Sequence, residues 1–417
     1  MFTGRIFDSI SNMADDLQPQ KVEKKKKSWL RYFLKLSEGT EIPEMFSIWC
    51  GLASISAALR RSVWIDMGVY RVYPNMFIIL VAGSGRCRKS TAIGLCEGLL
   101  HALKPSPNII AQKITPEALI EAMTVTGVGT DGEIKIVGGA CDGFVIVDEL
   151  STFLNRRSYE AGLASMLIPL YDCKEKFEYM TKGRGKEVLF NTCLGLLGGS
   201  TIEWIRSAIP EDAIGGGLTS RMVFIYEKVP PPPVAWTEYT EAQRIVKGRL
   251  VEALSSIGEV RGAVKLTEDA IEAYKKEYDR FYHQSGFYGN KLLQGYASRR
   301  HVHLLKVGMM LAMAEGPTRV IEPRHLQGAK ELLEVSEKNM PEVMSLIVAS
   351  ETGEMVARVM ETILKLGKVS RGELMRRFSH RIGAREMHEV LSTLILSGQI
   401  KHERGDGGGD CFYSGRG

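Results

Sequence analysis

Short runs of apolar residues recur along the first half of the chain, and each run ends at glycine or at polar residues. Because the runs are rich in Ile, Val and Leu without polar alternation, they predict strands buried on both faces of a sheet. Segments with helical spacing lie between them, so the order of elements predicts an α/β fold. The predicted strands are residues 77–82, 108–111, 144–147, 192–197 and 222–226, with helices at 90–100, 116–123 and 159–171.

Further elements precede and interrupt this region. Residues 28–59 hold two helical patterns, and the second, from Pro43 to Leu59, is apolar nearly all round, which predicts a buried helix. We expect residues 63–66 and 70–73 to be edge strands before the strand at 77–82. Residues 133–137 are expected to form a short strand, half of a hairpin.

The second half of the chain has a different pattern. The proline run at 230–233 cannot continue a sheet and therefore ends the α/β core. Residues 238–341 carry helical patterns, which predict a helical lid, and three helices with a glycine-tipped hairpin after residue 351 indicate a winged helix. The expected parts are a flexible basic lead-in (1–27), an N-terminal helical segment (28–75), the α/β core (76–235), the helical lid (236–345) and the winged-helix domain (351–417).

The composition narrows the class of protein. A chain of 417 residues with 44% hydrophobic content is long enough for two or three domains with their own cores. The seven cysteines are odd in number and form no C-x-x-C pair, which argues against a disulfide framework and a structural zinc site. No apolar run has membrane-spanning length and the N-terminus lacks a signal sequence, so we expect a soluble cytoplasmic protein without a membrane partner. The net charge of +5 is compatible with nucleic-acid binding through a local basic surface.

A glycine-bearing loop joins the strand at 77–82 to the helix at 90–100. Its backbone N–H groups can surround a phosphate at the helix N-terminus, where the macrodipole favours an anion. In this P-loop arrangement Lys89 reaches the β- and γ-phosphates of ATP, and the Ser90 hydroxyl binds Mg²⁺. The strict motif has glycine where this chain has Arg88, and the alternative is a chance glycine-rich turn. The expected phosphate-binding residues are Gly83, Ser84, Gly85, Arg86, Cys87, Arg88, Lys89, Ser90 and Thr91.

The apolar strand at 144–147 ends in two adjacent carboxylates, Asp148 and Glu149. At the end of a buried strand that accompanies a P-loop, Asp148 suits a Mg²⁺ ligand and Glu149 suits a base that polarises the attacking water. The alternative is that the two acids merely begin a loop. The strand at 192–197 leads to Ser200 and Thr201, and one of these hydroxyls is expected near the γ-phosphate. These residues together predict hydrolysis of ATP with Mg²⁺.

Basic residues gather at two places where nucleic acid could bind. A glycine-bearing turn between two β-prone runs predicts a hairpin over residues 180–188, with a basic tip. A solvated turn is an equal alternative for this tip, and the winged helix could contact a protein instead of DNA. The candidate DNA contacts are Lys182, Arg184 and Lys186 on the hairpin, and Arg381 and Arg385 on or near the third C-terminal helix.

The order of these motifs resembles that of a known group of proteins. Residues from about 40 to 345 are similar to P-loop ATPases of phages and mobile elements, long catalogued as a domain of unknown function, which often carry arginine before the P-loop lysine. More broadly, the chain resembles AAA+ ATPases, and its motif order is similar to that of minichromosome-maintenance helicases. The resemblance implies an arginine finger at Arg221, in Thr219-Ser220-Arg221, and a lid arginine at Arg299 or Arg300.

The resemblance implies a ring-shaped, hexameric, ATP-dependent DNA helicase for replication of a phage or mobile element in a bacterial or archaeal host. Its partners would be single-stranded or forked DNA, further copies of the chain and other replication proteins. Arg221 would reach the nucleotide of a neighbouring subunit, although a surface salt bridge is the alternative. One rival function is a non-unwinding AAA+ initiator or helicase loader. Another is a DNA-binding regulator with a degenerate ATPase, against which the intact Lys89, Ser90, Asp148 and Glu149 argue.

Overall fold

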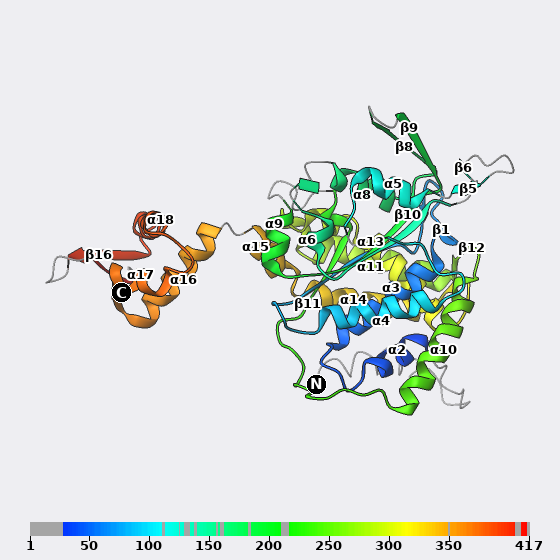
Figure 1. Ribbon diagram of the computed structural model, residues 1–417, viewed down its shortest axis with the longest axis horizontal. Coiled ribbons are helices and arrows are strands. Elements are labelled where there is room, and N and C mark those ends of the chain that lie inside the picture. Colours follow the sequence, from blue (N-terminus) through cyan, green and yellow to red (C-terminus); the bar gives the residue numbers. More distant parts are fainter. Residues whose placement is uncertain are drawn as a thin grey trace. The chain divides into compact units, whose positions relative to one another are not determined.

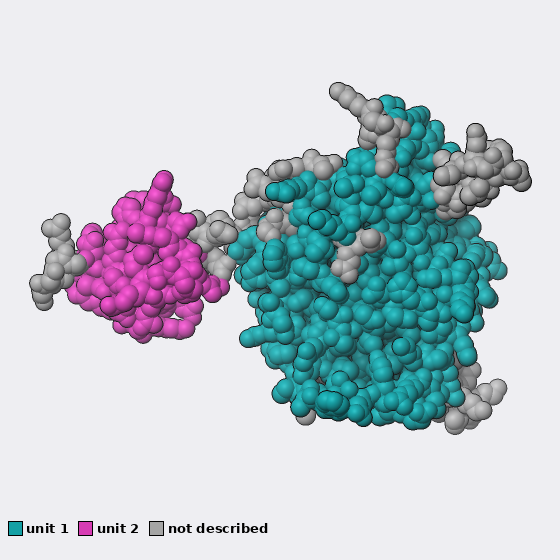
Figure 2. Space-filling view, in the orientation of Figure 1, with its two compact units in different colours: residues 1–347 teal, residues 348–417 magenta. Residues whose placement is uncertain are grey.

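The chain divides into two compact units, residues 1–347 and 348–417 (Figure 2). The structure is a computed structural model, and it describes residues 28–110, 113–124, 126–128, 134–136, 140–155, 157–158, 162–181, 185–209, 217–348, 351–404 and 410–414. The expected basic lead-in at 1–27 lies outside these residues. Within the described ranges, no helix has both the length and the apolar character needed to cross a membrane.

The first unit is built on a five-stranded sheet whose neighbouring strands are all parallel. The strand order across the sheet is β11-β3-β10-β7-β4, which confirms the predicted α/β character. Strands that are distant in sequence thus become neighbours, and residues following different strands meet at one edge. The strands are β3 (Phe77–Val81), β4 (Ile109–Ile110), β7 (Asp142–Val147), β10 (Cys193–Ser200) and β11 (Met222–Tyr226).

Helices cover both faces of this sheet. Figure 1 shows α3 (Glu44–Leu59) and α4 (Lys89–Ala102) on one side and α8 (Leu163–Tyr171) on the other. Fifteen of the 16 residues of α3 are buried, as its apolar pattern predicts. The predicted start of α5 (Pro116–Met123) is also confirmed, because the Thr115 hydroxyl accepts a hydrogen bond from the backbone N–H of Ala118. Of the helix predicted at 159–171, α8 covers the later part, and residues 159–161 lie outside the described chain.

The helices expected to form a lid belong to the core of the first unit. Except for the two helices α12 and α15, they share one hydrophobic cluster with α2 (Trp29–Ser37), α3 and α4. The Trp29 indole N–H donates to the carbonyl of Leu250 at 2.9 Å. Because their apolar faces are buried against the N-terminal helices, the segment 236–345 is no separate compact unit. These helices are α10 (Glu241–Gly258), α11 (Glu268–Gln284), α12 (Gln294–Ala297), α13 (Arg300–Ala314), α14 (Pro323–Glu337) and α15 (Met340–Val348).

In the described part of the first unit, short strands form four further sheets of two or three strands each. The strands expected at 63–66 and 70–73 are present as β1 (Val63–Asp66) and β2 (Arg71–Val72), but they lie outside the main sheet because β1 pairs with β12 (Gly262–Ala263). The predicted hairpin half at 133–137 is β6, paired with β5. Further elements of this unit are β5 (Thr126–Val128), β6 (Ile134–Ile136), α6 (Leu150–Phe153), β8 (Lys176–Thr181), β9 (Gly185–Phe190), α9 (Ile202–Ala208), β13 (Lys265–Leu266) and β14 (Val320–Ile321).

The second unit contains the three predicted helices and the predicted hairpin around a small core of its own. A third strand, β15, was not predicted, because three residues are too few to show a strand pattern. It completes an antiparallel sheet of order β15-β17-β16. The elements are α16 (Glu351–Leu366), β15 (Lys368–Ser370), α17 (Arg371–Phe378), α18 (Ala384–Leu396), β16 (Ile400–Arg404) and β17 (Asp410–Ser414).

Candidate functional site

The loop between β3 and α4 is tightly curled. Gly85, Cys87 and Arg88 all have positive φ, at 65°, 61° and 45°. Left-handed residues within a loop turn successive N–H groups toward one side, which forms a concave site for an anion. The 14-residue helix α4 begins directly after this loop, so its free N–H groups and dipole add to the attraction. The geometry is therefore suited to binding phosphate.

Lys89, the first residue of α4, is buried inside this loop. Its ammonium donates to the backbone carbonyls of Ala82 at 3.1 Å and of Gly83 at 3.2 Å. Burial lowers the pKa of Lys89, and the charge of Glu149 acts in the opposite direction. Lys89 and Glu149 are thus close enough to interact, although 60 positions separate them in the sequence.

Two carboxylates follow β7 at the same edge of the sheet. Burial raises the pKa values of both Asp148 and Glu149, and the charge of Glu97 on α4 adds to the effect on Asp148. A carboxylate with a raised pKa is a stronger base than one in water. The Ser200 hydroxyl donates to Glu149 Oε1 at 3.1 Å, which orients this carboxylate. Asp148 and Ser90 are both exposed, so both oxygens are accessible to a metal ion.

The two hydroxyls expected near the γ-phosphate, those of Ser200 and Thr201, both make hydrogen bonds to protein groups. Ser200 is fully buried at the end of β10 and holds Glu149. Thr201 caps α9, because its hydroxyl accepts a hydrogen bond from the N–H of Trp204 at 3.3 Å. Ser200 therefore positions the acidic edge, and Thr201 fixes the start of α9. Gly199, just before them, lies so close to β7 that an added Cβ would be 2.5 Å from the carbonyl oxygen of Asp148.

Arg88 contributes its backbone to the loop, whereas its side chain points away from it. Its guanidinium donates to Glu41 at 2.7 Å, and Glu41 also accepts a hydrogen bond from the N–H of Val234 at 2.9 Å. The ion pair lowers the pKa of Glu41 and raises that of Arg88. Because φ is positive at Arg88, glycine would fit there without strain. Arg88, which replaces the glycine of the strict motif, thus connects the loop through Glu41 to the segments around residues 41 and 234. Its side chain does not enter the space that the loop encloses.

Arg221 lies at the opposite edge of the sheet from this loop. It precedes β11, whose first residue, Met222, pairs with Phe77 at the start of β3. Since β3 has five residues at roughly 3.3 Å each, about 16 Å of strand separate Arg221 from the loop of its own chain. The structure therefore does not bring Arg221 together with Lys89.

Arg221 and Arg299 meet at one carboxylate, Asp172, which follows α8. Arg221 Nε and Nη2 donate to the two Asp172 oxygens at 3.0 and 2.5 Å, and Arg299 Nη1 is 3.5 Å from Oδ1. The Arg221 side chain is 5% exposed, so this ion pair is internal and not the surface pair that was the alternative. Burial, followed by the charge of Arg221, lowers the pKa of Arg299. Two cations share a single carboxylate here, which leaves net positive charge at this edge.

The structure also distinguishes Arg299 from Arg300 as the candidate lid arginine. Arg300 is only 2% exposed and donates to Glu277 at 2.7 Å and to Glu337 at 2.8 Å. This buried network holds α11, α13 and α14 together. The Arg299 side chain is 31% exposed, so Arg299 is the one of the two that could reach another molecule.

The basic residues proposed for DNA differ in their surroundings. Lys186 on β9 pairs with Glu178 on β8 at 3.0 Å, and Lys176 binds the same carboxylate at 2.5 Å. Lys182 and Arg184 lie outside the described residues. In the second unit, Arg381 is exposed in the turn between α17 and α18, and Arg385 on α18 is 3.4 Å from Glu389 with its side chain 92% exposed.

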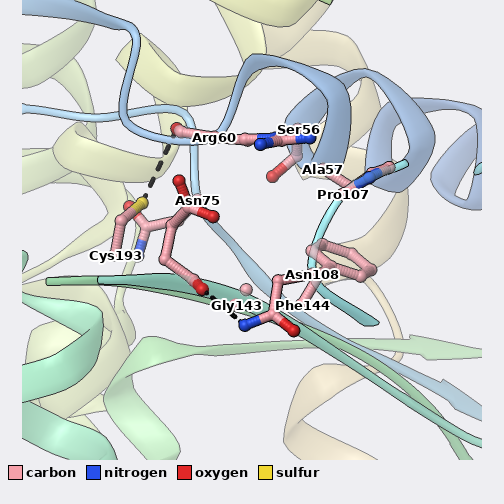
Figure 3. Close-up of a pocket in the computed structure, with 11 residues that line it drawn as sticks. Ser56, Ala57, Arg60, Asn75, Pro107, Asn108, Gly143, Phe144 and Cys193 are labelled. Carbon is pink, nitrogen blue, oxygen red and sulfur yellow. Dashed lines mark hydrogen bonds between the residues drawn. The ribbon is translucent and has the colours of Figure 1, made fainter. Parts of the chain in front are cut away.

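A small cavity lies at the edge where the sheet strands begin, as Figure 3 shows. Asn75, Asn108 and Cys193 contribute to its wall, and its volume of about 10 Å³ has room for roughly one water molecule. It is too small for a nucleotide.

Sequence patterns did not identify Asp172 or Glu203 as candidate site residues. Asp172 is separated by 49 positions from Arg221 and by 127 from Arg299, so no local pattern relates them. Burial lowers the pKa of Lys89, and the charge of Glu203, in the first turn of α9, acts in the opposite direction together with that of Glu149. A signal for Glu203 was present, since it follows the Ser200-Thr201 pair at a strand end.

In the described part of the chain, no group of three or more His, Cys, Asp or Glu side chains could hold a metal ion by itself. Mg²⁺ commonly binds through one or two protein oxygens together with substrate phosphates and water, and Ser90 with Asp148 fits that pattern. Comparison of the sequence with models of known protein families finds no match, and a search of curated proteins finds none either.

Proposed function

We propose that this chain is an ATPase that acts as a ring of identical subunits, hexameric by analogy, and translocates on single-stranded or forked DNA as a replicative helicase. The observation that carries the proposal is the convergence at one sheet edge of a curled loop, a buried lysine and two acids with raised pKa values. A P-loop ATPase with a basic hairpin and a C-terminal winged helix would have this organisation.

The residues at this edge suit distinct parts of ATP hydrolysis. The loop N–H groups and Lys89 would bind the phosphates, while Glu149, oriented by Ser200, would accept a proton from the attacking water. Ser90 and Asp148 would hold Mg²⁺, which neutralises charge on the phosphates when it is bound. Burial disfavours the charged forms of Lys89 and Glu149, as the lowered pKa of Lys89 and the raised pKa of Glu149 indicate. The same low dielectric would strengthen the contacts of these groups with charges on ATP and Mg²⁺.

The edge that holds Arg221 and Arg299 suits action on a neighbouring subunit. About 16 Å of strand separate it from its own loop. Its excess positive charge would favour the γ-phosphate of ATP bound to the next copy, where an arginine stabilises charge that develops during transfer. A closed ring would supply this contact to every site.

A second function is an initiator or helicase loader that uses ATP as a switch and binds DNA through its C-terminal unit. The pairing of Lys186 with Glu178 favours it, because part of the hairpin charge is already neutralised. In the leading proposal the hairpin contacts the DNA backbone, and in the second Arg381 and Arg385 do so.

Strand displacement on forked DNA, measured beside ATP hydrolysis, tests the proposal. We expect ATP-dependent displacement by the full chain, lost in Lys89→Ala and retained in Lys247→Ala, a change of an exposed lysine on α10. Hydrolysis without displacement would favour the loader. Absence of hydrolysis under conditions where the chain binds ATP would refute both functions.

A further inference from the structure

Asp172 occupies a position between the arginine pair and the basic hairpin. It follows the last residue of α8, and Cys173 with positive φ, 54°, then turns the chain toward β8, which begins at Lys176. A movement of Asp172 would therefore displace the residues at the base of the hairpin β8–β9. Arg221 and Arg299, in contrast, come from two elements far away in sequence.

The base of this hairpin is held by backbone hydrogen bonds. The N–H of Asn191 donates to the Glu175 carbonyl at 2.8 Å, and the N–H of Thr192 donates to the Lys174 carbonyl at 3.0 Å. Arg61 Nη1 also donates to the carbonyls of Cys173 at 2.6 Å and Thr192 at 2.7 Å. Residues 172–175 are thus tied at one end to the arginine pair and at the other to the start of β10.

The contact between Asp172 and the two arginines is open to another anion on the side of Arg299, whose side chain is 31% exposed. The Arg221 side chain is 5% exposed beneath Asp172 and also donates to the carbonyl of Gly217, so it would become accessible only when Asp172 moves away. A phosphate group carries more charge than a carboxylate and offers three oxygens, so it can bind two guanidinium groups at once. The Asp172 side chain is 29% exposed, and on release it would be solvated by water at little cost.

We propose that Asp172 is a latch that couples the nucleotide of a neighbouring subunit to the DNA-binding hairpin. In the free subunit its carboxylate holds Arg221 and Arg299. In the ring the γ-phosphate on the neighbour takes over both arginines, and the freed Asp172 lets the base of the hairpin move. This inference rests on the proposed function, because it requires a ring with shared nucleotide sites.

Replacing Asp172 with asparagine tests the latch. Without the competing charge, Asp172→Asn should assemble with ATP at a protein concentration roughly tenfold lower than the natural chain, the scale of one charge-assisted hydrogen-bond partner. Because the hairpin is uncoupled, the ratio of DNA-stimulated to basal ATP hydrolysis should fall toward one. Glu315→Gln is the matched control, since Glu315 has the same 29% exposure and pairs with Arg324 at 3.0 Å away from this edge.

An assembly concentration or a stimulation ratio equal to that of the natural chain, in a folded Asp172→Asn protein, would overturn the latch. If this variant does not fold, because Arg221 is left buried without its partner, hydrogen exchange on the natural chain decides. Assembly with a non-hydrolysable ATP analogue should accelerate exchange of the Asn191 and Thr192 amides, and unchanged exchange in the assembled ring would reject the latch. Failure of the natural chain to assemble or hydrolyse ATP would instead refute the proposed function.

Discussion

Gly199→Ala should disrupt the acidic edge by a steric effect that can be worked out from the structure. A Cβ at this position would lie 2.5 Å from the Asp148 carbonyl oxygen and 3.3 Å from Ile93 Cδ1. The first of these contacts is with backbone, which cannot rotate away, so the end of β7 would have to move by about 1 Å to restore an ordinary van der Waals distance. Asp148 and Glu149 would move with it.

The expected magnitudes follow from this displacement. Overpacking of a close-packed core costs about 1–3 kcal/mol of unfolding free energy. A catalytic base displaced by about 1 Å lowers the rate by about 10²-fold. We therefore expect a lower denaturant midpoint and a turnover number for ATP reduced by about two orders of magnitude, with ATP binding through the loop largely retained.

Gly98→Ala is the matched control for this substitution. Gly98 lies on the exposed side of α4, and an added Cβ there would meet nothing within 4 Å. Alanine in a helix interior should stabilise the chain by about 0.5–1 kcal/mol and leave hydrolysis unchanged. Equilibrium unfolding and steady-state ATP hydrolysis of both variants provide the measurement. Wild-type stability and turnover in Gly199→Ala would refute the steric argument.

Four further outcomes are expected. Glu149→Gln should bind ATP in a filter-binding assay yet lose turnover, whereas Lys89→Ala should lose binding; normal turnover in the glutamine variant would reject Glu149 as the base. Arg221→Ala should be inactive alone but regain hydrolysis when mixed with Lys89→Ala, and no rescue in rings shown to be mixed would argue against action between subunits. Replacing the three basic hairpin residues by alanine should make the salt dependence of single-strand binding shallower by a few units, and an unchanged slope would place the DNA elsewhere. Burial lowers the pKa of His303 to about 3, so between about pH 6.5 and 3 the imidazole binds a proton only in the unfolded chain. The free energy of unfolding should therefore decline by on the order of 4 kcal/mol as the pH falls through that range. Urea unfolding of His303→Gln should show a weaker decline, and a decline equal to that of the natural chain would reject the role of His303.

Much of the central architecture could be predicted because its signals are local. The strands β3, β7, β10 and β11 contain short apolar runs, and the start of α5 has its own cap, so a few adjacent residues predict each of these elements. The loop with Lys89 and the acids after β7 are likewise recognisable from adjacent residues. Parallel pairing then brings them to one edge without further information from the sequence.

The remaining features depend on contacts between distant segments. β1 pairs with β12 across about 200 positions, and no property of either strand specifies that neighbour. The side chain of Arg88 is paired with Glu41 and that of Arg221 with Asp172. These ion pairs join residues far apart in the sequence, so no local pattern predicts them. The helices after residue 236 were expected to form a separate lid, because the sequence does not show which surface they cover. That apolar surface belongs to α2 and α3, at the other end of the chain.

The burial of α3 by late elements has a consequence for synthesis of the protein. This helix is apolar on nearly every side, and two of its partners, α10 and α13, are made about 180 to 250 residues after it. At a ribosomal speed of about 5–20 residues per second, its surface stays uncovered for roughly 10 to 50 s. During that time the nascent chain presents a long hydrophobic segment that chaperones recognise and that other chains can capture. Expression at lower temperature with abundant chaperone should therefore increase the soluble yield far more than any change near the loop.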